Sequence, residues 1–311
     1  MRTYLARRLA LVIPTVLGVA TLVFALIHLV PGDPIDVMLG ETAASADRVH
    51  LRQQLGLDRP LWFQYARFLR RTAVGDLGRS LHSGRPVNGL IGACYPATLE
   101  LAGFALLVAA SIALPLGMGS AVRPHSVVDA TAQAVAVLSS SIPSFWLGPL
   151  LVLVFSIGLE WTPVSGRGGF AHLVLPGLTL GLGLSATLTR MLRATLLERL
   201  HDDYIRTARA KGASETRVFL GHALRNAAIP LLTVLGLQAG ALLGGAVITE
   251  TIFAWPGLGR LLIQAIQTRD YPVVQGCVLV IALSYVLINL ATDVAYVLVD
   301  PRVRVRAEGT P

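Results

Sequence analysis

The sequence predicts an all-α protein that crosses a membrane several times, and three observations lead to this prediction. Of the 311 residues, 54% are hydrophobic and only 14% are charged, whereas an average soluble domain has about 25% charged residues. The mean hydropathy is +0.65. Apolar runs of about 20 residues, the length that crosses a bilayer as a helix, recur along the chain. A soluble two-domain protein does not readily accommodate so many long apolar runs.

Six membrane spans are predicted, and the first is a retained span rather than a cleaved signal peptide. The first run follows three arginines, but it is too long for the apolar core of a signal peptide, and no small-residue cleavage site follows it. The third run is long for one span and contains Pro143, which bends a helix. The six runs are 9–30, 98–122, 127–159, 173–189, 227–249 and 273–299.

Arginine placement predicts that both chain ends face the cytoplasm, where loops are enriched in Lys and Arg. With the N-terminus inside, 15 of the 26 basic residues fall on inside segments, and the short outside loops hold only Arg167, Arg260 and Arg269. The net charge of +8 then belongs to the flanks of spans and to lipid headgroup contacts, so a nucleic-acid partner is not expected. The predicted segments are a cytoplasmic N-terminus 1–8, span 9–30, an extracytoplasmic region 31–96, a transmembrane core 97–299 and a cytoplasmic tail 300–311.

The extracytoplasmic region contains one predicted helix, which starts where Pro60 follows Asp58. Its apolar residues recur at helical spacing, and arginines lie elsewhere around it. Such a helix lies in the membrane interface or packs on neighbouring loops, and the pattern fits both. The apolar residues are Leu61, Tyr65, Phe68 and Leu69, and the arginines are Arg67, Arg70 and Arg71.

Glycines in the fourth and fifth spans recur every four residues, a spacing that lets helix backbones approach closely in lipid. They serve packing within the bundle or contact with a second permease subunit, and both interpretations remain open. No tandem repeat marks a duplicated transporter, so six spans call for a partner to enclose a pathway. The glycines are Gly177 and Gly181 in one span and Gly236, Gly240 and Gly244 in the other.

Serines surround Pro143 in the third span. They satisfy backbone carbonyls that the proline frees, or they line a wet pathway at membrane depth. These candidate lining residues are Ser139, Ser140, Ser141 and Ser144. Asp293 in the sixth span poses a similar choice, between a pathway and an ion pair with Arg190 or Arg193.

Residues 194–226 are predicted to form two short cytoplasmic helices. Asp202 or Asp203 caps the first, and Arg206 lies four residues after Asp202, a favourable spacing for an exposed ion pair. Arg209 and Lys211 fall in the last turn, where cations complement the helix dipole. A left-handed residue, Gly212, ends the helix. Ser214 caps the second helix, which runs to Asn226, and Pro230 lies near the start of the fifth span.

The segments 204–212 (YIRTARAKG) and 222–230 (HALRNAAIP) resemble the cytoplasmic signature loop of ATP-binding cassette importer permeases, and specifically of the dipeptide/oligopeptide/nickel subfamily. The broad superfamily has an acidic residue and two alanines where this chain has Arg206, Thr207 and Ala208, a departure that is usual in the subfamily. Further short matching blocks are distributed along nearly the whole chain. They are 31–34 (PGDP), 56–61 (GLDRPL), 75–78 (GDLG), 96–101 (PATLEL), 140–145 (SSIPSF) and 250–259 (ETIFAWPGLG).

The resemblance implies one of two membrane subunits of a bacterial plasma-membrane importer, forming half of a pathway for di- and oligopeptides, or for nickel, glutathione or another small ligand. It implies a heterodimer with a second related permease, two ATPase subunits or one fused ATPase that bind ATP and Mg²⁺, and an extracytoplasmic substrate-binding protein. The helix around residues 203–211 is then the coupling helix that docks on an ATPase. Its implied coupling residues are Asp203, Tyr204, Arg206, Thr207, Ala208, Arg209, Lys211 and Gly212.

The chain has no motif for catalysis or for a resident cofactor. Its only lysine, Lys211, follows Ala210, so no Gly-x-x-x-x-Gly-Lys phosphate loop occurs, and no His-Glu-x-x-His or Gly-x-Ser-x-Gly motif is present. Energy is therefore expected from a partner or a gradient. A stand-alone secondary transporter, the alternative, needs carboxylates inside the membrane, but Glu100, Glu250 and Asp293 all lie near span ends.

Overall fold

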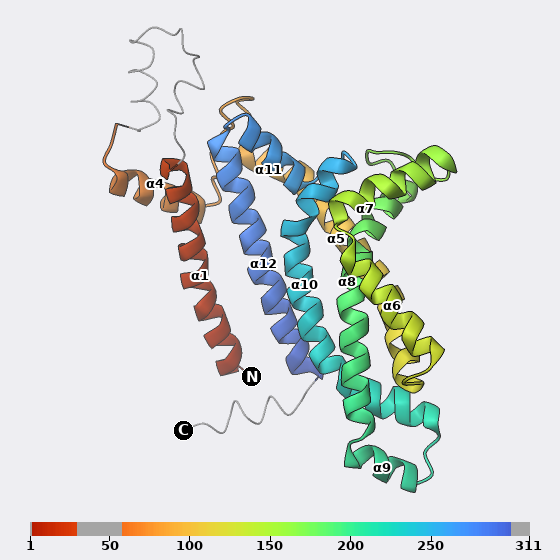
Figure 1. Ribbon diagram of the computed structural model, residues 1–311. Helices are drawn as coiled ribbons and strands as arrows, with labels where there is room; N and C mark the ends of the chain where they lie inside the picture. Colours follow the sequence, from red (N-terminus) through yellow and green to blue (C-terminus); the bar gives the residue numbers. More distant parts are fainter. Residues whose placement is uncertain (1, 30–57, 300–311) are drawn as a thin grey trace. The chain divides into compact units, whose positions relative to one another are not determined.

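The computed structural model describes the backbone of residues 2–29 and 58–299, which form helices joined by short turns and one isolated β-bridge between Arg79 and Pro86 (Figure 1). The all-α prediction is confirmed for these residues. Predictions for 30–57 and for the tail 300–311 lie outside the described residues. The elements are α1 (Arg2–Leu29), α4 (Leu61–Ala73), α5 (Val87–Val122), α6 (Val127–Ser141), α7 (Ser144–Leu151), η1 (Val152–Gly158), α8 (Phe170–Leu200), α9 (Asp203–Ala210), η2 (Arg217–Ala223), α10 (Leu224–Ile252), α11 (Leu258–Gln267) and α12 (Tyr271–Val299).

Four helical stretches in the described residues are long and apolar enough to cross a membrane. They contain the predicted second and fourth spans and most of the fifth and sixth: Val87–Val122, Phe170–Leu200, Arg217–Gly244 and Tyr271–Ala295. The first predicted span falls in α1, whose apolar stretch Ala10–Ala25 is shorter. The polytopic prediction therefore holds. The described residues give four such stretches, a fifth where the bent pair Val127–Ser141 and Ser144–Gly158 counts as one span, and a shorter apolar stretch where the first span was predicted.

The predicted third span is two helices at an angle rather than one bent helix. The helices Val127–Ser141 and Ser144–Gly158 meet at 101°. Pro143 precedes α7 with φ −62° and ψ 140°, and Ile142 is extended at ψ 116°. A proline disfavours helical backbone at the residue before it, so both residues leave the helical region and the chain turns sharply.

Residues 99–255 and 285–299 form one compact unit, in which close contacts are made at glycines. A Cβ atom on Gly177 would lie 2.2 Å from the Phe104 ring, and one on Gly181 would lie 2.7 Å from Val108 of α5. In α10, Gly236 faces Thr292 and Gly240 faces Tyr285 of α12, whereas nothing lies within 4 Å of a Cβ on Gly244. Helix–helix contact within the chain thus occupies four of the five predicted glycines.

Residues 2–29, 58–98 and 256–284 form the second compact unit, built on the N-terminal parts of α5 and α12 together with α1, α4 and α11. Val87 and Ile91 of α5 pack with Val273 and Cys277 of α12, and Ala20 and Val23 of α1 pack with Leu279. The two cysteines of the sequence, Cys94 and Cys277, are both free thiols.

Candidate functional site

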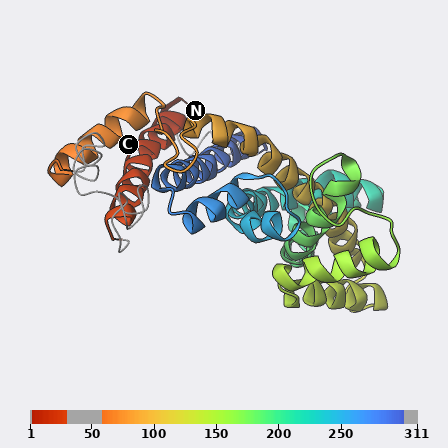
Figure 2. The same cartoon turned by 90° about the horizontal axis from the view of Figure 1, so that it is seen from above.

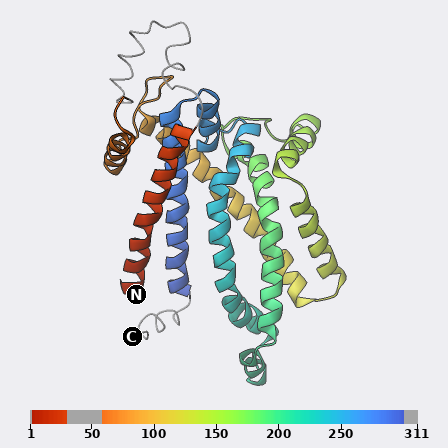
Figure 3. The ribbon, with the colours of Figure 1, turned by 60° about the vertical axis from the view of Figure 1, so that its left-hand side comes forward.

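The helix α9 (Asp203–Ala210) lies beyond the end of α8 (Figure 3), joined to it by the short turn at His201 and Asp202. A single residue of the helix, Ile205, is fully buried, at 0% exposure. It packs in a cluster with Leu192 and Leu196 of α8 and Val218 of η2. Ala208, one turn further along, packs against the same cluster. One apolar stripe therefore fixes α9 to the ends of two long helical segments.

The remaining side chains of α9 form an exposed polar face. Asp203, Tyr204, Arg206 and Thr207 are all exposed, and so is Lys211 directly after the helix. Arg206 lies 3.7 Å from Asp203, a contact that is worth little at such exposure. The sequence placed all five residues in the coupling helix, and the structure brings them to this face.

The predicted ion pair between Asp202 and Arg206 is wrong. Asp202 pairs with Arg199, Nη1 to Oδ2, at 3.4 Å. Asp202 precedes the helix with an extended backbone, ψ 147°, so its side chain does not follow the helical spacing that places residues four apart on one face. Its side chain makes no capping hydrogen bond either.

The predicted left-handed end of α9 is confirmed. Gly212 has φ +79°, and two backbone hydrogen bonds close the end: Ala213 N–H donates to the Ala208 carbonyl at 3.1 Å, and Gly212 N–H donates to the Arg209 carbonyl at 2.9 Å. This pair of bonds is the Schellman arrangement. The helix end is thereby closed by backbone groups alone.

A charge-assisted pair locks the segment that follows α9. Arg209 Nε donates to Glu215 Oε1 at 2.8 Å, and Nη2 donates to Oε2 at 3.0 Å. The guanidinium lowers the pKa of Glu215 below its usual value, and the carboxylate raises that of Arg209. Both pKa shifts favour the charged forms, so both groups stay ionised at neutral pH. Arg209 therefore holds the loop after α9 instead of extending freely from the helix.

The predicted second cytoplasmic helix does not end at Asn226. The Ser214 hydroxyl accepts from Arg217 N–H at 3.4 Å, close to the predicted cap, but η2 then continues directly into α10. Pro230 lies inside α10 rather than near its start. Burial explains the continuity, because Ala223 and Ala227 are both 0% exposed in the cluster under α9.

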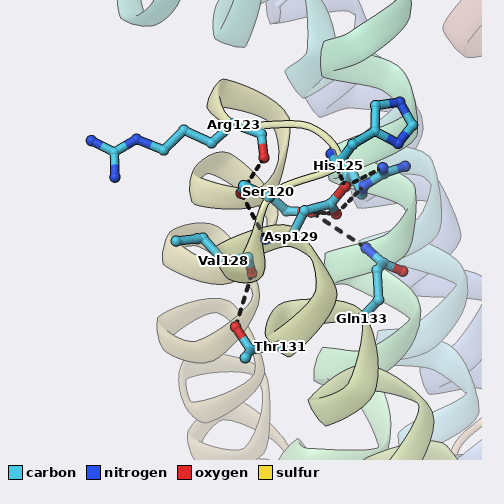
Figure 4. A network of polar contacts seen from close by, with 9 residues as sticks. Ser120, Arg123, His125, Val128, Asp129, Thr131 and Gln133 are labelled. Atoms are coloured by element: carbon cyan, nitrogen blue, oxygen red, sulfur yellow. Dashed lines mark hydrogen bonds and ion pairs between the residues drawn. The ribbon is translucent and has the colours of Figure 1, made fainter.

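A buried ion pair that the sequence analysis missed braces α8 near the same end (Figure 4). Arg193 donates from Nε and Nη2 to the two carboxylate oxygens of Asp129 at 2.7 and 2.6 Å. Asp129 is 4% exposed and also accepts from the Ser120 hydroxyl and from His125 N–H. Ser126 and Asp129 at the start of α6 have the spacing of a capping box. This spacing could have drawn attention to Asp129 in the sequence, but it does not indicate Arg193 as its partner.

Arg193, one of the two arginines considered as a partner of Asp293, binds Asp129, and the choice between an ion pair and a pathway role for Asp293 stays a prediction. Of the predicted pathway serines, Ser140 and Ser141 donate to the Val137 carbonyl at 2.9 and 2.8 Å. The carbonyl that loses its N–H donor to Pro143 is that of residue 139, so these bonds to Val137 do not decide between the two roles considered. Ser139 and Ser144 are half-buried, and a role in lining a pathway stays a prediction for all four.

Two family models together cover almost the whole chain. Residues 113–305 match the model described as "Binding-protein-dependent transport system inner membrane component". Residues 1–102 match the model for the N-terminal part of such membrane components. The larger match includes α9, the Asp129–Arg193 pair and the helices that carry them.

Curated relatives agree over their full length. The chain is 44% identical to the "Dipeptide transport system permease protein DppB" of Escherichia coli (strain K12), covering 98% of this chain and 99% of the relative. It is 45% identical, with the same coverage, to the "Di/tripeptide transport system permease protein DppB" of Pseudomonas aeruginosa (strain UCBPP-PA14). It is 43% identical to the "Glutathione transport system permease protein GsiC" of Salmonella paratyphi A, again with the same coverage.

Solved structures share the fold. A chain from "Inward facing conformations of the MetNI methionine ABC transporter" matches with a TM-score of 0.57 and 20% identity, over 68% of this chain and 96% of that one. A chain from "Crystal structure of an amino acid ABC transporter with histidines" matches with a TM-score of 0.50 and 16% identity. At such identities the likeness shows the fold alone.

Proposed function

The chain belongs to the family of binding-protein-dependent transport system inner membrane components, as a permease of the dipeptide type, and on this premise we propose that it forms half of the pathway of an ATP-driven peptide importer. Its partners are a second related permease, ATPase subunits that bind ATP and Mg²⁺, and an extracytoplasmic binding protein. Both chain ends face the cytoplasm. The coupling site is α9.

The observation that carries this proposal is the two-sided construction of α9. Ile205 ties the helix to α8 and η2, and the opposite face offers Tyr204, Arg206 and Lys211 to a partner. A short helix held by one buried residue and presenting polar side chains suits docking on another protein. The alternative of a self-sufficient transporter gives this face no role.

A movement of α9 driven by the ATPase subunits would pass to the membrane helices through packed side chains and ion pairs. The closed helix end at Gly212 and the Arg209–Glu215 pair keep α9 and the following segment together as a rigid unit. Motion therefore passes through Ile205 to α8, and the Asp129–Arg193 pair ties α8 to α6. ATP binding by the ATPases would bias this coupled element between two positions, as an allosteric switch requires.

Peptides are the proposed cargo, because the relatives at 43–45% identity over 98% of this chain are named for dipeptides, di/tripeptides and glutathione, which is itself a tripeptide. Glutathione is the alternative cargo that a relative's name supports directly.

Co-expression of the chain with the genes of its candidate partners tests the function. We expect ATPase subunits to co-purify, and we expect ATP turnover in proteoliposomes to rise when the binding protein is loaded with dipeptide. A chain that purifies alone and moves solute without nucleotide would overturn the proposal in favour of a secondary transporter. Glutathione-loaded binding protein, tested in parallel, separates the two cargoes.

Charge reversal on the exposed face of α9 tests the docking site. We expect Arg206→Glu to reduce co-purification of ATPase subunits severalfold while leaving the thermal midpoint of the chain unchanged, because Arg206 is exposed and makes only a loose contact. Arg85→Glu, an equally exposed reversal on the loop before α5, is the matched control and should retain the ATPase. Equal retention by both variants would count against α9 as the docking helix.

A further inference from the structure

The proposed coupling mechanism does not involve the helix α4 (Leu61–Ala73). Its side chains form three distinct faces. One face packs on α1 (Figure 2). The Tyr65 hydroxyl lies 2.6 Å from the Thr21 hydroxyl. The ring of Phe24 lies 5.2 Å from that of Tyr65 and 5.7 Å from that of Phe68. This contact fixes how the helix is rotated about its own axis.

The second face is an apolar stripe that is exposed at Trp62, Ala66 and Ala73 and half-buried at Leu69. Trp62, Ala66, Leu69 and Ala73 follow one another at intervals of four, three and four residues, so they share one side of the helix. Trp62 is 72% exposed. Leu69 borders the cluster that α1 forms with α12, so the stripe adjoins the packed face.

The third face is basic. Arg67 and Arg70 are exposed, and in the described part of the chain neither takes part in an ion pair. Arg71 differs, because its Nε binds Asp76 Oδ2 at 2.9 Å. The helix has no acidic residue, so the face carries two uncompensated positive charges next to the apolar stripe.

The level of α4 along α1 places it near a membrane boundary. It contacts α1 at Thr21 and Phe24, and the apolar run of that segment continues in the sequence to Val30. At about 1.5 Å per helical residue, the contact lies about 9–14 Å before the end of the run. Amphipathic helices at a membrane surface bury their apolar face to about 5–10 Å.

We propose that α4 lies in the membrane interface, with the exposed stripe residues Trp62, Ala66 and Ala73 among the acyl chains and with Arg67 and Arg70 bound to anionic phospholipid headgroups. Lipid fits this surface better than a protein partner does. Arg67 and Arg70 lie together beside the apolar stripe, so their guanidinium groups would meet lipid phosphates when the stripe enters the acyl chains. On α1, Leu17 and Leu22 are exposed apolar side chains. This inference is independent of the coupling role of α9.

Depth measurements at two adjacent positions test the placement. Ala66→Cys and Arg67→Cys variants of the full chain, spin-labelled in nanodiscs of phosphatidylcholine and phosphatidylglycerol, place one probe on the apolar stripe and one on the basic face of α4, about 100° apart around the helix. The unsubstituted chain corrects for any label on Cys94 or Cys277. We expect the label at 66 to be relaxed mainly by oxygen and the label at 67 mainly by a water-soluble nickel chelate. Two aqueous labels, or two labels shielded from both reagents by a covering protein, would overturn the proposal.

Lipid selectivity tests the role of the arginines. Arg67→Gln with Arg70→Gln removes both charges, and Arg79→Gln with Arg85→Gln on the following loop is the matched control. We expect the first pair to lower the phosphatidylglycerol retained after extraction from mixed vesicles by about fivefold or more, and the control pair to leave it unchanged. Retention that is equal in all three chains would refute headgroup binding by α4.

Discussion

Asp129 and Arg193 lie 64 positions apart in the sequence and meet through two hydrogen bonds where Asp129 has almost no solvent contact. The removal of one partner of a buried pair leaves the other charge uncompensated, which is the costly case. Glu100 and Arg167 give the contrasting arrangement, because their side chains are about two-fifths exposed at an N–O distance of 2.6 Å. Water screens such a pair and takes over when it breaks.

Asp129→Ala is therefore expected to lower the thermal midpoint of the detergent-purified chain by roughly 5 °C or more, as followed by fluorescence-detected size exclusion. Glu100→Ala is the control and should change the midpoint by about 2 °C or less. Asp129→Leu combined with Arg193→Met should recover part of the loss, because no unpaired charge remains. Equal midpoints for the Asp129→Ala and Glu100→Ala variants would contradict the distinction.

At Gly212 the backbone requires a residue that tolerates φ near +79°. We expect Gly212→Val to reduce peptide-stimulated ATP turnover severalfold, because a β-branched side chain resists this conformation and opens the end of α9. Gly212→Asn should retain most of the turnover, since asparagine enters the left-handed region more readily.

Gly89→Val, at an exposed helical glycine with nothing within 4 Å, controls for the added side chain. Normal turnover and normal ATPase co-purification in the Gly212→Val variant would show that the helix end is not needed for coupling.

The features of α9 divide into those that local sequence determines and those that it does not. The end at Gly212 was predictable, because a left-handed cap depends on residues within one turn. The Asp202–Arg206 pair was predicted wrongly, because the cap residue lies outside the helix, and the Arg193–Asp129 pair was not predicted at all. Partner choice between distant residues follows from tertiary packing, which spacing in the sequence does not encode.

Among the helices, the glycine contacts differ in what surrounds them. A Cβ on Gly181 would lie 2.7 Å from a Val108 methyl and 2.9 Å from the Ala105 carbonyl oxygen, and a backbone atom has little freedom to move away. Gly244 has open space around it.

Gly181→Ala is expected to destabilise the isolated chain by about 1–3 kcal/mol through overpacking, which a fall in thermal midpoint would report. Gly244→Ala should leave that midpoint unchanged. If Gly244 contacts the second permease, its larger variants should reduce co-purification of that subunit instead. A midpoint that falls equally in both alanine variants would contradict the described packing.

Helix positions were predictable from hydropathy, but their bounds and angles were not. The run 98–122 was identified, yet α5 begins at Val87. Its first turns are helical because Val87 and Ile91 pack against α12, and this packing cannot be predicted from mean hydropathy. Pro143 was expected to bend one span, whereas the two helices meet at 101°. The π-helical turns η1 and η2 carry no signal in the composition of the chain.

For the whole molecule, we expect the energy source to lie outside this chain. No phosphate-binding loop occurs in the sequence, so we expect the purified chain to show no ATP hydrolysis above a blank in a coupled-enzyme assay, and activity to appear only when the ATPase subunits are added. Turnover that persists in the chain alone after removal of trace contaminants would contradict this expectation.

The single lysine of the sequence, Lys211, lies exposed directly after α9. Reagents that acylate primary amines therefore have one side-chain target in the whole permease, apart from the α-amino group at its start. A fluorophore ester or a short cross-linker would label the proposed contact between α9 and the ATPase subunits without any mutation. The rate of acylation at this amine, followed by mass spectrometry through a transport cycle, would report when the helix is covered and when it is free.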